Sequence, residues 1–242
     1  MYVQQSPPPR RYGSLRVEPS DLAPARWLEQ RPPGDDGFGT VAGVCAPGFD
    51  AYARILHPAR LAEAPVRWER VAEVYGRSVT AETRWHEVIG APDPFLYRND
   101  DPPAVPGVWD EHPDEGPTPA DVARLLIPVL ARHTRTPGHC WFGLWEGYGR
   151  YDWDGLPVFR TPGRDEILLA GPLDHADSPA RDTTEAALEL PDLWWPEDRA
   201  WCVGGDVDLV STYVGGTAAC VADLLATPGL EAHPVAPTDS VN

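Results

Sequence analysis

Lysine is absent from the 242-residue sequence, so all 20 basic residues are arginines. Several lysine-dependent chemistries are therefore excluded: the phosphate-binding lysine of a P-loop, Schiff-base formation and a serine–lysine catalytic dyad. The absence of lysine, together with 29 prolines and abundant alanine, glycine and arginine, is also typical of a genome of high GC content.

Long apolar runs are missing as well. The longest, residues 125–131, is far too short to span a bilayer, and the N-terminal segment lacks the apolar core of a signal peptide. These features predict a cytoplasmic protein. The four cysteines, Cys45, Cys140, Cys202 and Cys220, are widely separated and form no C-x-x-C pair. This spacing predicts buried free thiols rather than a zinc site or a redox motif.

Recognisable catalytic and cofactor motifs are also lacking. The seven histidines show neither H-E-x-x-H nor H-x-H spacing, and no serine lies in a G-x-S-x-G turn. No glycine-rich segment has the strand–GxGxxG–helix context of a dinucleotide site. The sequence therefore predicts no metal and no cofactor.

The charge balance is strongly acidic, with a formal net charge of −17. Such a chain repels phosphate backbones and anionic lipid heads, so neither nucleic acid nor a membrane surface is an expected partner. An apolar content of 42% with ten tryptophans is enough for one sizeable core. We therefore expect a folded domain whose partner is a protein or a small molecule.

Three amphipathic helices are predicted. Residues 68–75 and 122–130 carry apolar side chains at helical spacing, with Thr118 as the N-cap of the second helix, and Thr217 is a plausible N-cap for a third helix at 217–225. Pro128 lies inside the second helix and is expected to bend it. A weaker helix is expected after Ser20.

Strands account for most of the remaining apolar segments. Residues 39–46 and 51–57 read as a hairpin, 140–147 as a central strand with both faces buried, and 156–161 and 165–173 as a second hairpin. A long strand over 200–210 continues or bends into 211–216, and 230–235 reads as an edge strand.

Strands that occur in runs, without regularly interleaved helices, indicate an α+β fold. We predict a mixed, largely antiparallel sheet packed by a few helices, in a single domain over residues 16–242. Residues 1–15 are expected to be a disordered proline-rich tail, and the acidic, proline-rich stretch 92–117 a long loop within the domain.

Two aspartates are the first candidates for chemistry. Asp206 and Asp208 fall on the same face of the predicted 200–210 strand, roughly 7 Å apart at a rise of about 3.3 Å per residue. Such a pair is usually solvated or paired with arginine. The alternatives are a polar binding site, and a metal or acid–base site in which Glu197 joins them.

The segment 193–202, LWWPEDRAWC, is the second candidate. Pro196 favours an extended residue before it, so Trp194 and Trp195 should point in different directions, one into the core and one near the surface. Together with Trp145 and with Arg199 and Glu146 at its rim, this region suits a ligand pocket or a protein interface, or else a core corner closed by an ion pair.

Residues 193–216 (LWWP-DRAWC followed by D-D--STYVGG) and 140–149 (CWFG-WEG-G) resemble a family of uncharacterised actinobacterial hypothetical proteins. The resemblance covers the C-terminal half most distinctly. The family has no established activity, so the resemblance implies a source and supplies no catalytic residue.

Two functional hypotheses follow. The first is a non-catalytic protein- or small-ligand-binding domain that acts through Trp194, Trp195, Arg199 and the acidic loop, with a layout similar to immunity or SUKH-like interaction domains by fold-level analogy alone. The second is a hydrolase that uses Asp206 and Asp208, with Glu197 or a divalent cation.

Overall fold

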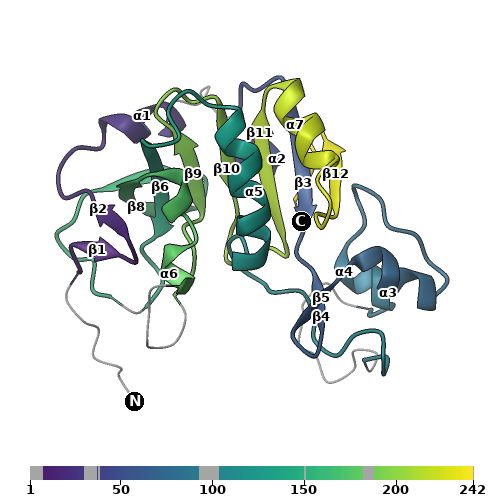
Figure 1. Ribbon diagram of the computed structural model, residues 1–242. Coiled ribbons are helices and arrows are strands. Elements are labelled where there is room, and N and C mark those ends of the chain that lie inside the picture. The colour runs from purple at the N-terminus through teal and green to yellow at the C-terminus, as the bar shows by residue number, and fades with distance from the viewer. Residues whose placement is uncertain are drawn as a thin grey trace, which may run out of the picture.

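The computed structural model describes residues 8–29, 37, 39–92, 104–149, 151–181 and 188–241. Its centre is a ten-stranded sheet in the order β1-β2-β8-β6-β9-β10-β11-β3-β12, with β7 paired to β8. A separate two-stranded sheet is formed by β4 and β5. Helices pack against the large sheet, so the predicted α+β fold is confirmed (Figure 1).

The strands of the large sheet are β1 (Arg11–Tyr12), β2 (Leu15–Val17), β3 (Ala51–Leu56), β6 (Cys140–Trp145), β7 (Val158–Thr161), β8 (Arg164–Gly171), β9 (Leu193–Pro196), β10 (Trp201–Gly204), β11 (Ser211–Gly216) and β12 (Ala232–Val235). The small sheet consists of β4 (Ala59–Leu61) and β5 (Ala64–Val66). The α-helices are α1 (Arg26–Glu29), α2 (Val41–Cys45), α3 (Trp68–Val74), α4 (Trp85–Ile89), α5 (Ala120–Arg132), α6 (Ser178–Arg181) and α7 (Ala218–Leu225).

Several strand predictions are confirmed. The strand β6 lies inside the sheet between β8 and β9, and β7 and β8 form the predicted antiparallel hairpin. The strand β12 lies at the sheet edge beside β3. The turn at Pro162 and Gly163 between two strand-like segments predicted the pairing of β7 with β8.

The segment 39–46 was predicted as a strand, and that prediction is wrong because it forms the helix α2. The side chain of Thr40 accepts a hydrogen bond from the Gly43 amide and caps the helix. The helix lies directly on the sheet, where a Cβ added to Gly204 would come within 2.2 Å of the Val44 carbonyl oxygen. A bare backbone at Gly204 therefore permits this close packing and stabilises a helix of only five residues.

The predicted 200–210 strand is also wrong beyond its first part. The strand β10 ends at Gly204, a turn follows, and β11 returns antiparallel to β10. Asp206 and Asp208 therefore lie in the connecting turn and not on a strand, and the Asp208 amide donates to the Asp206 carboxylate at 3.0 Å.

The helices α5 and α7 cover one face of the sheet (Figure 1). The helix α5 begins one residue later than the predicted N-cap Thr118 implies, with Pro119 as its N-cap, and Pro128 lies in its interior as expected. Thr217 caps α7 by accepting from the Cys220 amide, which confirms that prediction. Both helices bury their apolar side chains against the core that contains Trp194 and Trp201.

The opposite face carries α1 over a core that contains Phe159, Leu168 and Trp195, and α2 over a neighbouring core that contains Tyr52 and Tyr213. The helices α3 and α4 form a further cluster around Trp68, Trp85 and Trp109. The predicted helix at 68–75 is confirmed as α3, and α1 with the preceding 3₁₀ turn at Ala23–Ala25 occupies the weaker helical segment.

The N-terminal tail prediction is wrong for residues 11–15, because β1 and β2 add to the sheet through β8. Of the predicted loop, residues 93–103 lie outside the described part, and 104–117 contain no helix or strand but bury Trp109. All four cysteines are free and buried, as predicted. Within the described residues, no helix combines the length and the apolar character needed to cross a membrane.

Candidate functional site

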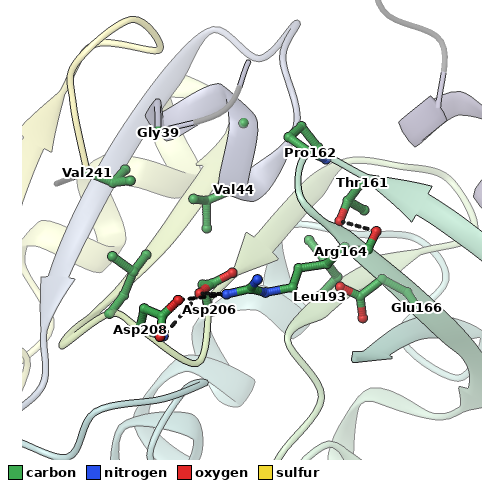
Figure 2. A pocket seen from close by; sticks show the side chains of 13 residues that line it. Gly39, Val44, Thr161, Pro162, Arg164, Glu166, Leu193, Asp206, Asp208 and Val241 are labelled. Carbon is green, nitrogen blue, oxygen red and sulfur yellow. Dashed lines mark hydrogen bonds and ion pairs between the residues drawn. The ribbon is translucent and has the colours of Figure 1, made fainter. Parts of the chain in front are cut away.

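A cavity of about 120 Å³ lies on the face of the sheet that carries α2. Gly43 and Val44 of α2 line one side, and Arg164 and Glu166 of β8 line another. The turn that carries Asp206 and Asp208 also contributes to the wall (Figure 2). Three segments that are far apart in the sequence therefore meet around one polar space.

Arg164 holds the two aspartates together. Its Nη2 atom lies 2.8 Å from Asp206 Oδ1 and 2.8 Å from Asp208 Oδ2, and Figure 2 shows the side chain extending toward both carboxylates. The guanidinium also stacks over the ring of Trp145, 4.8 Å from its centroid. The arginine-paired interpretation of Asp206 and Asp208 is therefore the one that the structure supports.

Glu166 is the unusual member of the site. It is only 2% exposed, and its Oε2 atom has no hydrogen-bond partner. Burial raises the pKa of this carboxyl well above its ordinary value, and the charges of Asp192 and Asp206 raise it further. A buried carboxylate without donors is costly, so the neutral acid is the favoured form of Glu166 in the empty cavity.

Asp192 lies close to this acid and differs from it in having partners. Its carboxylate accepts hydrogen bonds from the Trp145 amide at 2.9 Å and the Tyr148 hydroxyl at 2.8 Å. Burial raises the pKa of Asp192 to about 7, although these hydrogen bonds favour the ionised form. The site therefore combines one acid that the protein satisfies with one that it leaves unsatisfied.

The tryptophan prediction needs correction. Trp194 and Trp195 are both fully buried, so neither stays near the surface. They point to opposite faces of β9, as predicted: Trp194 belongs to the core under α5, and Trp195 to the core under α1. Because both faces of this sheet are covered by helices, opposite directions do not make one of them exposed.

The remaining predicted binding residues do not form one wall. Arg199 is exposed and stacks over Trp27 at 5.5 Å, beside Trp195. Trp145 contacts Arg164 and Tyr148 instead, and the neighbouring Glu146 is exposed. The residues predicted to form one binding surface therefore lie at two separate sites, one at Trp27 and one at Arg164.

Glu197 does not join the aspartates. Its carboxylate accepts a hydrogen bond from the indole N–H of Trp141, which is paired in register with Trp195. Asp206 and Asp208 instead share Arg164. Within the described part of the chain, no group of three or more histidine, cysteine, aspartate or glutamate side chains is placed to hold a metal ion.

Arg164, Glu166 and Asp192 were missed by sequence reasoning. The signal was present in β8, where alternation places Arg164 and Glu166 on the same face as the buried Leu168. A polar side chain at an inward position of a strand is the exception that marks a candidate site.

Comparison with protein-family models, with curated protein sequences and with solved structures finds no significant match to this chain. The resemblance to actinobacterial proteins stays a prediction, and function has to be argued from the cavity itself.

Proposed function

We propose that this chain is a binding domain whose cavity at Glu166 takes a small cationic group, such as an ammonium or a guanidinium. The observation that carries the proposal is Glu166, a residue that lines the cavity and whose buried Oε2 atom lacks a donor. A ligand N–H would supply that donor, and a positive charge would favour the ionised carboxylate over the neutral acid.

The charge around the cavity supports a cation rather than an anion. The carboxyl groups of Glu166, Asp206 and Asp208 line the cavity together with Arg164, and the charge of Asp192 acts on Glu166. An anionic ligand would meet repulsion from this set, whereas a cation would reduce the repulsion among its members. The volume of about 120 Å³ is enough for several water molecules or for one small polar group.

The proposal keeps the binding-domain hypothesis but moves its site. A surface at Trp194 and Trp195 has no support, since both side chains are fully buried. The hydrolase hypothesis is not favoured by any observation, because Asp206 and Asp208 are held by Arg164 and Glu197 binds Trp141 elsewhere.

Amide chemical-shift titration by NMR tests the proposal. Ethylammonium and methylguanidinium are compared with neutral acetamide, using the wild-type chain, Glu166→Gln, and Glu63→Gln as a matched control at an exposed position. We expect both cations to shift amides of β8 and the 205–209 turn, and Glu166→Gln to weaken binding by about tenfold or more. Equal binding of acetamide, or unchanged affinity in Glu166→Gln, would contradict the proposal.

Calorimetry adds a second signature. If Glu166 is neutral in the empty cavity and ionised beside a bound cation, binding releases a proton at pH 7. The apparent binding enthalpy should then depend on the ionisation enthalpy of the buffer in the wild type, and this dependence should shrink in Glu166→Gln.

A further inference from the structure

A second and larger cavity, of about 320 Å³, lies on the same face of the sheet near Arg54, Arg84 and Tyr213. We propose that this cavity is a binding site for a small oxyanion, a carboxylate or a phosphate, held by Arg54 and Arg84. The proposal is independent of the cation site at Glu166.

Arg54 provides the first argument. It is only 7% exposed, and three of its five N–H groups are used by the protein. The Nε group donates to Ser211 Oγ at 3.0 Å, and Nη1 donates to the carbonyl oxygens of Ala81 at 2.9 Å and Thr83 at 2.8 Å. The two N–H groups of Nη2 remain for another partner.

The acceptors that hold Arg54 carry no charge. Two are backbone carbonyls and one is a hydroxyl, and within the described residues no carboxylate comes within ion-pair distance of this guanidinium. Its remaining contact is with the face of Trp68, 5.6 Å from the ring centroid. Buried charges in proteins are normally paired, so a guanidinium that is oriented but lacks a counter-ion is suited to receive an anion.

Arg84 provides a second positive charge. It precedes α4, lines the same cavity, and forms no ion pair in the described part of the chain. Burial lowers the pKa of Arg54, and the nearby charge of Arg84 acts in the same direction, whereas Tyr213 and Glu87 act against it. Two like charges that face one cavity repel each other, and an oxyanion between them would relieve that repulsion.

The acidic residues of this cavity do not neutralise the arginines by direct contact. Asp239 accepts the Ala236 amide at 2.8 Å, and Glu82 is exposed to solvent. Tyr213 also lines this cavity. A small oxyanion of one or two negative charges therefore fits the charge of the site, and the shared chemistry is an oxygen ligand that accepts from Nη2 of Arg54.

The helix α2 and the C-terminal segment separate the two cavities. Val41 of α2 lines the cavity at Arg54 and Arg84, and Val44 of α2 lines the cavity at Glu166. The Val41 amide donates to the Asp239 carbonyl at 3.0 Å, and the Val241 amide donates to the Gly39 carbonyl at 3.0 Å. These bonds place a wall of backbone between the two sites, so a variant of one leaves the side chains of the other intact.

Thermal unfolding with inorganic phosphate and with acetate tests the inference, with sodium chloride added to hold ionic strength constant. We expect at least one of these anions, at tens of millimolar, to raise the Tm of the full chain in a concentration-dependent manner. Arg84→Gln should weaken the apparent affinity by about tenfold. Arg10→Gln, at an exposed position with no role in the cavity, should leave it unchanged.

Each result with the two anions has a distinct meaning for the proposed site. Stabilisation by phosphate alone assigns a tetrahedral ligand, and stabilisation by acetate alone assigns a planar one. Absence of stabilisation by both anions overturns the proposal, and so does an unchanged affinity in Arg84→Gln. Arg54→Gln, where it folds, should abolish the effect. Arg84 keeps the test decisive, because within the described residues its side chain makes no hydrogen bond that caps α4 and no ion pair.

Discussion

Glu166 places its Oε2 atom above the bare backbone of Gly143. A Cβ at position 143 would lie 3.3 Å from that oxygen and 2.8 Å from the Phe159 ring. The glycine therefore makes room for this carboxyl group beside the side chains of Phe159 and Leu193. The fold provides room for the carboxyl group but no donor to its Oε2 atom. Burial raises the pKa of Glu166, and the missing donor makes this side chain suitable as a ligand contact.

Glu166→Gln is expected to stabilise the empty protein at neutral and alkaline pH. The folded-state pKa of Glu166 lies well above its ordinary value of 4.5, so as the pH rises above 4.5 the unfolded chain loses its proton first. Wild-type stability falls over this range, whereas glutamine does not titrate. The variant should therefore gain stability relative to the wild type as the pH rises from 4.5 to 8.

Urea unfolding at several pH values measures this gain, with Glu63→Gln as the control that should show none. His57, whose pKa burial lowers to about 4, acts in the opposite sense, because its contribution is lost as the pH falls from 6.5 to 4. The comparison must therefore use the difference between variant and wild type. A pH-independent difference would mean that Glu166 is ionised in the folded protein.

Arg164→Met should destabilise the fold by about 1–3 kcal/mol at pH 7, between the values typical of exposed and buried ion pairs. The substitution leaves Asp206 without its partner and removes the cation from the Trp145 ring. It also removes a positive charge that lowers the pKa of Glu166. Without that charge, ionisation of Glu166 costs more in the folded protein, so the loss of unfolding free energy should be larger at pH 8 than at pH 5.

Chemical denaturation of the single variant and of Arg164→Met with Asp206→Asn measures this effect. The double variant should recover part of the loss, because the unpaired carboxylate is gone. Arg160→Met is a suitable control, since its side chain is 78% exposed and its ion pair with Asp165 lies at the surface. A double variant that is less stable than the single one would contradict the assigned role of Arg164.

Much of the fold was predictable from local pattern. The strand β6 and the β7–β8 hairpin follow from alternating side chains and a Pro-Gly turn, and α5 and α7 from apolar stripes. The helix α2 was not predictable in the same way. Its valines and flanking turn residues favour a strand locally, and only contact with Gly204, far along the chain, stabilises the helix.

The candidate site was predicted in part. Asp206 and Asp208 were predicted on one face of a strand, but the strand ends at Gly204 and it is Arg164 that joins them. Arg164 and Glu166 come from another strand, and no local pattern says which distant residues face that turn. The prediction of a surface at the tryptophans was wrong, because a high density of aromatic residues is typical of both cores and binding surfaces. Trp194 and Trp195 instead fill two cores on opposite faces of the sheet.

Arg199→Gly should be more stable than Arg199→Ala, a reversal of the usual order of these residues. Arg199 has φ of 53°, in the left-handed region that disfavours any residue with a Cβ by about 1 kcal/mol or more. Both variants lose the contact with Trp27, worth about 0.5–1 kcal/mol at an exposed site, but only glycine relieves the backbone. Urea unfolding of the two variants measures the difference, expected near 1 kcal/mol. Alanine equal to or better than glycine would contradict this assignment.

Gly204→Ala should be strongly destabilising, because the new Cβ would meet the Val44 carbonyl at 2.2 Å and the Cys45 Cα at 2.9 Å. These are backbone atoms that cannot rotate away, so α2 must shift from the sheet at a cost of about 2–3 kcal/mol or more. Gly138→Ala is the matched control, since nothing lies within 4 Å of its Cβ position and its φ is not in the left-handed region. That control should be neutral or slightly stabilising. Because Gly43 and Val44 line the cavity at Glu166, a folded Gly204→Ala protein should also bind ethylammonium more weakly. Stability near that of the wild type would show that α2 does not depend on close contact with the sheet.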